Sequence, residues 1–157
     1  MWCCYFIASL HNNQTYIGAT DNFVKRLNKH NTGKGAKKTR GQTWIPYVII
    51  SGFHHKNACL SFESGWKRLA KIRSNKKIDG INLMASQRLS YIGSDTRWNR
   101  ILDLLFFLHT VTLEGTKYRM NYFNTATPQH LVINIYAEDI VSVLPWPYYV
   151  SCNDIIF

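Results

Sequence analysis

Two short strand-like runs at the start of the chain, joined by a tight polar turn, most constrain what it can fold into. Residues 2–9 (WCCYFIAS) are apolar and aromatic, which is typical of a buried strand. The turn-forming residues 11–14 (HNNQ) follow, and residues 15–19 (TYIGA) predict a second strand. The chain is therefore predicted to begin with a β-hairpin on which the next elements must pack.

Helix and strand patterns alternate after this hairpin. Thr20 or Asp21 can cap a short helix. The apolar stripe of that helix is predicted to be Phe23, Val24 and Leu27. A polar loop at 31–43 leads to a third strand at 44–53, and residues 55–74 predict a longer helix. The expected fold class is α+β: a small β-β-α-β-α core with a mixed or antiparallel three-stranded sheet flanked by helices.

The composition of residues 74–80 (SNKKIDG) is typical of a linker, so we expect two parts, 1–75 and 76–157. The second part is predicted to be an α+β extension that packs on the first part or on a partner. Its predicted elements are a largely buried helix at 96–110, strands at 118–123 and 131–136, and an extended segment at 144–149.

Positive charge is concentrated in the first half of the chain. Residues 1–80 hold 14 Lys and Arg against 3 Asp and Glu, whereas residues 81–157 hold 5 against 6. The balances of +11 and −1 give the formal net charge of +10. Such an uneven distribution indicates that the first half meets a polyanion, with nucleic acid favoured. Charge alone leaves an anionic membrane surface open.

No apolar run approaches the ~18 residues that a membrane span requires. The amino terminus lacks the charged segment of a secretory signal. The four cysteines show no zinc-binding spacing, which favours reduced, mostly buried thiols. We therefore expect an intracellular protein, in the nucleus or the cytoplasm.

Three groups of residues could carry chemistry. Arg26 and His30 are four residues apart and share a helix face, which could also be a basic face that touches phosphates or water. Glu63 lies on the apolar stripe between Cys59 and Trp66, where a carboxylate is unusual unless it is ion-paired or binds a metal.

Tyr5 and Tyr16 lie in the two strands of the hairpin, where their rings could face the same side of the sheet or serve only in packing. The loop after the first helix carries four further basic side chains that could grip a phosphate backbone. These are Lys34, Lys37, Lys38 and Arg40. Contacts of this kind give salt-dependent affinity without sequence information.

Together these residues resemble the GIY-YIG nuclease superfamily. The second motif is present in full as Tyr16-Ile17-Gly18, whereas the first matches Cys3-Cys4-Tyr5 only in its tyrosine. Arg26 and His30 fall on the helix arginine and histidine of the family, and Glu63 falls on its metal-binding glutamate. Asn75 lies roughly where some members carry a late asparagine.

A finer pattern resembles the eukaryotic-type structure-specific endonuclease catalytic subunit, which cuts flaps and branched DNA. It consists of residues 30–41 (HNTGKGAKKTRG), Trp44, Gly52-Phe53, Ala58 and residues 62–66 (FESGW). That branch usually ends in a zinc module that engages a scaffold partner. After residue 75 this chain has only Cys152, so the module cannot be built.

The resemblance implies that Tyr5 is the general base for water and that Arg26 steadies the phosphate. Arg26 and a bound metal are then expected to lower the pKa of Tyr5. Tyr16 and His30 would orient Tyr5 or bind phosphate, and Glu63 would hold one Mg²⁺ or Mn²⁺ ion. The implied products carry 3′-hydroxyl and 5′-phosphate ends.

The implied partners are branched or flapped DNA, with a scaffold subunit or a second copy as further candidates and no membrane. Three other functions stay open at this stage. The chain could be a non-catalytic nucleic-acid-binding module, a protein-interaction or membrane-surface module, or a repair or mobile-element nuclease of the same superfamily.

Overall fold

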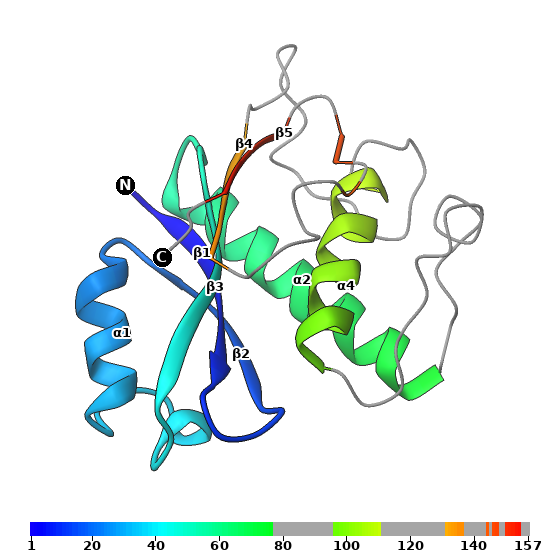
Figure 1. The fold of residues 1–157 in the computed structure, drawn as a ribbon. Helices are drawn as coiled ribbons and strands as arrows, with labels where there is room; N and C mark the ends of the chain where they lie inside the picture. The colour runs from blue at the N-terminus through cyan, green and yellow to red at the C-terminus, as the bar shows by residue number, and fades with distance from the viewer. Residues whose placement is uncertain (77–95, 111–130, 137–143, 145, 148–149, 155–157) are drawn as a thin grey trace.

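The computed structural model describes residues 1–76, 96–110, 131–136, 144, 146–147 and 150–154. These residues form an α+β fold in which a five-stranded sheet separates one helix from two others (Figure 1). The strands are β1 (Cys3–Ser9), β2 (Thr15–Thr20), β3 (Trp44–Ser51), β4 (Leu131–Ile135) and β5 (Val150–Asp154). The helices are α1 (Phe23–Asn31), α2 (Lys56–Lys76) and α4 (Thr96–Thr110), and a 3₁₀ turn, η1 (Lys37–Thr39), precedes β3. The predicted fold class and the β-β-α-β-α order are confirmed.

The sheet is larger than the three strands predicted. Its order is β2-β1-β3-β4-β5, antiparallel throughout except for the parallel pair β4 and β5. The predicted strand at 131–136 is β4, and it pairs with Val48–Ser51 of β3. Leu131, Ile133 and Ile135 alternate with half-buried residues, so one face of β4 completes the core. The sequence-predicted strand at 118–123 lies outside the described residues.

The central strand β1 is buried on both faces, which explains why its sequence is apolar throughout. Cys4 and Phe6 point into the cluster that packs under α2 and α4. Tyr5 and Ile7 point the other way, into a smaller cluster beneath α1. The alternation of side chains along β1 therefore places Tyr5 on the α1 face.

Helices α2 and α4 pack together on the opposite face of the sheet. The Trp66 ring lies edge-on to Phe6, and its indole N–H donates to the carbonyl of Arg100 at 3.1 Å. The rings of Phe62 and Phe107 meet at 5.0 Å between centroids. Residues beyond 95 therefore share a core with the first 75 residues. Within the described ranges, no helix is long and apolar enough to cross a membrane.

The cap of α1 differs from the prediction. Asn22 is the cap, and its side chain accepts a hydrogen bond from the N–H of Lys25 at 3.1 Å. Thr20 instead accepts from the N–H of Asn22 at 3.1 Å, and Asp21 is exposed. Of the three consecutive polar residues 20–22, the one directly before the helix acts as its cap.

The apolar stripe of α1 is also narrower than predicted. Phe23 and Leu27 pack beside Tyr5, whereas Val24 is 79% exposed. The face that includes Phe23 and Leu27 also carries Arg26 and His30, because residues three and four apart lie together on a helix. The packing of α1 therefore turns both basic side chains toward β1.

Candidate active site

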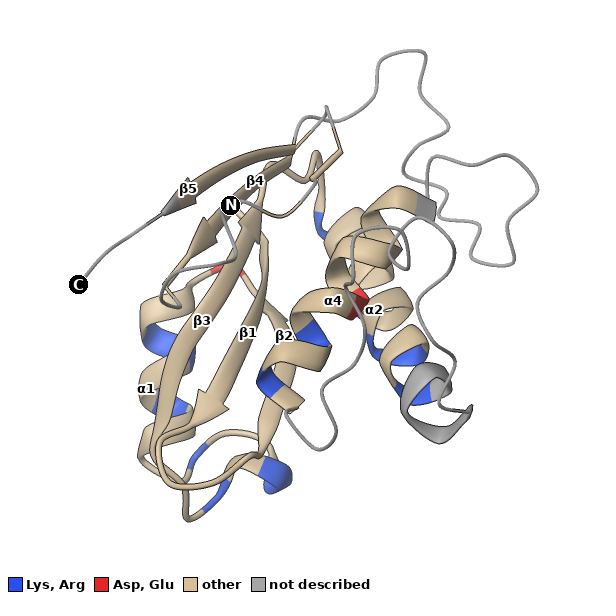
Figure 2. Ribbon diagram, turned by 45° about the vertical axis from the view of Figure 1, so that its right-hand side comes forward, with Lys and Arg blue, Asp and Glu red and all other residues tan. Residues whose placement is uncertain are grey.

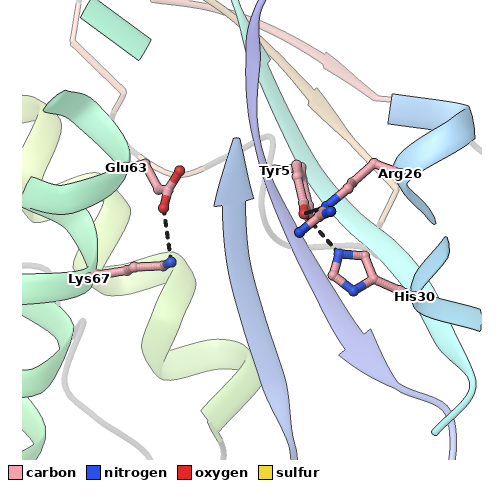
Figure 3. A network of polar contacts seen from close by, with 5 residues as sticks. All are labelled: Tyr5, Arg26, His30, Glu63 and Lys67. Carbon is pink, nitrogen blue, oxygen red and sulfur yellow. Dashed lines mark hydrogen bonds and ion pairs between the residues drawn. The ribbon is translucent and has the colours of Figure 1, made fainter. Parts of the chain in front are cut away.

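The hydroxyl of Tyr5 is the centre of a hydrogen-bonded group on the α1 face of the sheet (Figure 3). His30 Nε2 lies 2.8 Å from the hydroxyl oxygen, and Arg26 Nε donates to the same oxygen at 3.3 Å. Tyr5 and His30 are fully buried, whereas Arg26 is half-buried. The structure thus brings together three of the sequence-predicted residues, one from a strand and two from one helix.

A glycine on the neighbouring strand makes room for the Tyr5 ring. Gly18 of β2 pairs directly with Tyr5, and the phenol lies against its backbone. A Cβ atom at Gly18 would lie 2.3 Å from the hydroxyl oxygen and 2.4 Å from Cζ of Tyr5. Real Cβ atoms do not approach other atoms this closely, so Gly18 is part of the pocket that holds the phenol.

Tyr16 lies between the Tyr5–His30 pair and Lys67 of α2. Its ring lies on β2 with its centroid 6.3 Å from that of Tyr5 and 5.0 Å from that of His30. The ammonium of Lys67, which comes from α2, lies 5.2 Å from the centre of the same ring. The expectation that Tyr5 and Tyr16 face one side of the sheet agrees with this geometry.

Glu63 reaches the site from α2, on the other side of β2 from Tyr5 (Figure 3). Its neighbours on the helical stripe, Cys59 and Trp66, are fully buried. The Glu63 side chain itself is 19% exposed, and its Oε1 lies 2.9 Å from Lys67 Nζ. The ion pair that the sequence left open as an alternative is therefore present, and the carboxylate lies at the rim of the core.

The donor set at Glu63 suits a metal ion held largely by substrate and water. The described residues contain no group of three or more His, Cys, Asp and Glu side chains that could hold a metal. Mg²⁺ needs only one or two protein carboxylates when phosphate and water oxygens complete its shell. The single, partly exposed carboxylate of Glu63 fits that requirement.

Comparison with known proteins places these residues in a family. Residues 1–77 match the family model described as the GIY-YIG catalytic domain. The chain belongs to the GIY-YIG nuclease family. It is 48% identical over 163 aligned residues to Uncharacterized protein L300 of Acanthamoeba polyphaga mimivirus. The alignment covers 99% of this chain and 98% of that protein. GIY-YIG nucleases in general depend on a divalent metal ion.

The GIY-YIG part is also similar to proteins named Structure-specific endonuclease subunit SLX1. The protein from Phaeosphaeria nodorum is 39% identical over 71 residues, which cover 42% of this chain and 19% of that protein. The protein from Eremothecium gossypii is 38% identical over 87 residues, which cover 51% of this chain and 29% of that protein. The chain thus spans less than a third of the length of these two endonuclease subunits.

Burial dominates the acid–base properties of this GIY-YIG site. Burial raises the pKa of Tyr5, and its hydrogen bond from Arg26 offsets only part of that effect. Arg26 and a bound metal are expected to lower this pKa, but Arg26 alone does not bring it below its ordinary value. Burial, with the charge of Arg26 as a smaller cause, lowers the pKa of His30 to about 4. His30 is neutral near pH 7, while Tyr5 keeps its proton.

The lowered pKa of His30 predicts that acid destabilises the fold. Between about pH 6.5 and about pH 4 the unfolded chain binds a proton at His30 that the folded chain does not. The free energy of unfolding should therefore fall by about 2 kcal/mol between pH 7 and pH 4.5. Urea unfolding at several pH values measures this change, with His30→Gln as the control. Equal pH dependence in both proteins would contradict the assignment to His30.

The four basic residues of the loop lie at the surface beyond the site. Lys34, Lys37, Lys38 and Arg40 are all exposed. Figure 2 shows Lys and Arg on α1, on the loop that contains η1 and on α2. This loop directly follows α1, the helix that carries Arg26 and His30.

Sequence reasoning missed two residues that contact the site. Lys67 follows Glu63 by four residues, and this helical spacing could have predicted their ion pair. Thr39 contacts His30 Nδ1 at 2.8 Å, but no sequence signal separates it from the polar residues around it. Asn75 lies near the end of α2, and its side chain is outside the described part of the chain.

Proposed function

We propose that the chain is a metal-dependent endonuclease that hydrolyses phosphodiester bonds in branched or flapped DNA and leaves 3′-hydroxyl and 5′-phosphate ends. The observation that carries the proposal is the Tyr5 hydroxyl, held between Arg26 and His30, with the Glu63 carboxylate across β2 (Figure 3). Binding alone does not require a buried tyrosine hydroxyl that is bonded to a neutral histidine.

His30 solves a difficulty for Tyr5 as the general base. Because burial raises its pKa, Tyr5 is protonated and can take a proton from water only if its own proton leaves. Neutral His30 lies 2.8 Å away and accepts that proton at Nε2. One proton then moves from water to Tyr5 and one from Tyr5 to His30, while the water oxygen attacks phosphorus. The leaving 3′ oxygen then takes a proton from a solvent water, and His30 gives its proton back to solvent, which restores the neutral pair.

Arg26 has two roles in this proposal. It bonds to the Tyr5 hydroxyl and is the more exposed of the two side chains that do so. Tyr5 itself has no exposed surface. Arg26 therefore turns toward the scissile phosphate when DNA binds, which stabilises charge on that phosphate and opens the hydroxyl to water.

Glu63 is the residue that would hold the divalent cation, Mg²⁺ or Mn²⁺. When bound, this ion supplies positive charge near the leaving oxygen. Lys67 pairs with one carboxylate oxygen of Glu63, and its ammonium also lies over the Tyr16 ring.

The choice of branched DNA rests on the relatives and on the basic loop. The SLX1 proteins are named as structure-specific endonuclease subunits. The exposed basic residues contact backbone in a manner that carries no sequence information, as an enzyme that recognises DNA shape requires. We further propose that the chain acts with a scaffold subunit or as a homodimer, and that it works where DNA is processed inside the cell.

A cleavage assay with end-labelled DNA tests the proposal. A flap, a four-way junction and a plain duplex are compared with Mg²⁺ or Mn²⁺, for the wild type and for Glu63→Gln. We expect cuts near the branch and a loss of at least about 100-fold in Glu63→Gln. Ser64→Ala, an exposed neighbour on α2, is the matched control and should cleave like the wild type.

Each other outcome has a definite reading. Salt-sensitive binding without cleavage, even with a candidate scaffold subunit added, would favour a non-catalytic nucleic-acid-binding module. Equal cleavage of all three DNAs would favour a repair or mobile-element nuclease that tolerates any duplex. Full activity of the Glu63→Gln variant would show that Glu63 is not part of the active site.

A further inference from the structure

Both ring nitrogens of His30 have a partner in the buried site. Nε2 lies 2.8 Å from the Tyr5 hydroxyl, and Nδ1 lies 2.8 Å from Oγ1 of Thr39. His30 and Thr39 have no exposed surface. A neutral imidazole carries one N–H, so one nitrogen donates and the other accepts. Which nitrogen accepts decides whether Tyr5 can pass its proton to His30.

The Thr39 hydroxyl decides this question. Its Oγ1 also lies 2.8 Å from the carbonyl oxygen of Ala36, which can only accept. A hydroxyl has one proton to donate. Thr39 therefore donates to Ala36 and accepts from His30, so the imidazole proton is on Nδ1. The lone pair of Nε2 then faces the Tyr5 hydroxyl, as the proton transfer requires.

We propose that Thr39 is a positioning residue that fixes the tautomer of His30 and thereby the direction of proton transfer from Tyr5. This inference rests on the proposed function for its catalytic consequence. Thr39 is fully buried, and among the described residues its hydroxyl contacts only His30 and the carbonyl of Ala36, so it acts through His30. Its hydroxyl, rather than its bulk, carries the effect.

The structure holds Thr39 firmly enough for this role. It ends the 3₁₀ turn η1, where its N–H donates to the carbonyl of Ala36 at 3.0 Å. Its own carbonyl accepts from the indole N–H of Trp44 at 2.8 Å. Gly35 closes the pocket, because a Cβ atom there would lie 2.7 Å from His30 Nδ1. The imidazole therefore has little freedom to turn away from Thr39.

The turn that carries Thr39 also carries two residues of the basic loop. Lys37 and Lys38 are exposed on η1, two residues and one residue before the buried Thr39. Two of the lysines that the proposed function assigns to DNA therefore lie on the turn that orients His30. Anchoring of DNA and alignment of the proton acceptor share one short element.

Two variants of Thr39 test the inference. Thr39→Val keeps the shape but removes the acceptor, and a buried N–H without an acceptor is costly. The proton of His30 should then shift from Nδ1 to Nε2. Thr39→Ser keeps the hydroxyl and should retain the wild-type tautomer. The ¹⁵N chemical shifts of the ring nitrogens in metal-free, DNA-free protein report the tautomer, and comparison with His30→Gln assigns the signals.

Cleavage of end-labelled flap DNA gives the second readout. We expect kcat to fall about 100-fold in Thr39→Val, with KM for DNA changed by no more than about threefold, and Thr39→Ser to recover most of the rate. A Thr39→Val protein that keeps its proton on Nδ1, or that cleaves at the wild-type rate, would overturn the inference. Wild-type protein with Nδ1 protonated but no cleavage of any DNA would instead count against the proposed function and leave the tautomer assignment standing.

Discussion

Replacing Tyr5 with phenylalanine should abolish cleavage while the fold is retained. The substitution removes the oxygen that is bonded to His30 at 2.8 Å and to Arg26 at 3.3 Å. Without this hydroxyl no group passes the proton of water to His30, and loss of a general base costs about 10²- to 10⁴-fold in rate. We expect kcat for flap DNA to fall within that range, measured at saturating DNA and Mg²⁺.

The phenylalanine ring can occupy the same pocket. It would still pack against Phe23, whose ring centroid is 5.4 Å away, and against Gly18. The buried Nε2 of His30 would lose its partner, which costs on the order of 1–3 kcal/mol of stability. Urea unfolding therefore checks that Tyr5→Phe is still folded under the conditions of the assay.

Tyr47→Phe is the matched control for this experiment. The Tyr47 hydroxyl accepts from Arg97 at 3.3 Å, and its ring packs against Phe6 on the other face of the sheet. The same atom is removed, but at a position that the proposed mechanism does not use. We expect cleavage by Tyr47→Phe to stay close to the wild-type rate. Tyr5→Phe protein with more than a tenth of the wild-type rate would exclude Tyr5 as the general base.

The fold of the first 75 residues could be predicted because each element carries its own local pattern. The hairpin, α1, β3 and α2 appear where apolar spacing and turn residues place them. β5 (Val150–Asp154) could not be predicted, because its sequence VSCND is short and polar. It is a strand because it pairs in parallel with β4, and such pairing between distant segments leaves no local pattern.

The candidate site was predictable in its residue types but not in its acid–base state. The spacing of Arg26 and His30 places them on one helix face, and the structure brings both to Tyr5. The direction in which the pKa of Tyr5 shifts depends on how completely the sheet and α1 exclude water from the phenol. That exclusion is a property of packing. The tautomer of His30 likewise depends on a contact with Thr39 that only the folded loop creates.

Replacing Gly18 with alanine should inactivate the site without removing any polar group from it. The new Cβ atom would lie 2.3 Å from the Tyr5 hydroxyl oxygen, 2.4 Å from Cζ and 2.9 Å from Cε1. The ring cannot move aside freely, because it is fully buried and bonded to His30. We expect overpacking to lower the free energy of unfolding by about 1–3 kcal/mol. A hydroxyl displaced by about 1 Å should lower kcat by about 100-fold.

A second glycine separates loss of stability from displacement of the phenol. Gly41 has φ +77°, and a Cβ atom there would meet no other atom within 4 Å, so Gly41→Ala strains the backbone but touches nothing in the site. That strain costs about 1–2 kcal/mol, similar to the cost expected for Gly18→Ala. We expect Gly41→Ala to lose stability and keep its activity. Equal loss of activity in the two variants would mean that reduced stability alone explains the effect.

The Gly18 and Tyr5 substitutions act on one contact, so their effects on cleavage should not add. In a Tyr5→Phe background the hydroxyl that Gly18→Ala displaces is already absent. Adding Gly18→Ala to Tyr5→Phe should therefore cost little further activity, whereas two independent sites would multiply their losses. A double variant that is about 100-fold slower than Tyr5→Phe would show that Gly18 serves cleavage by a route other than the position of the Tyr5 hydroxyl.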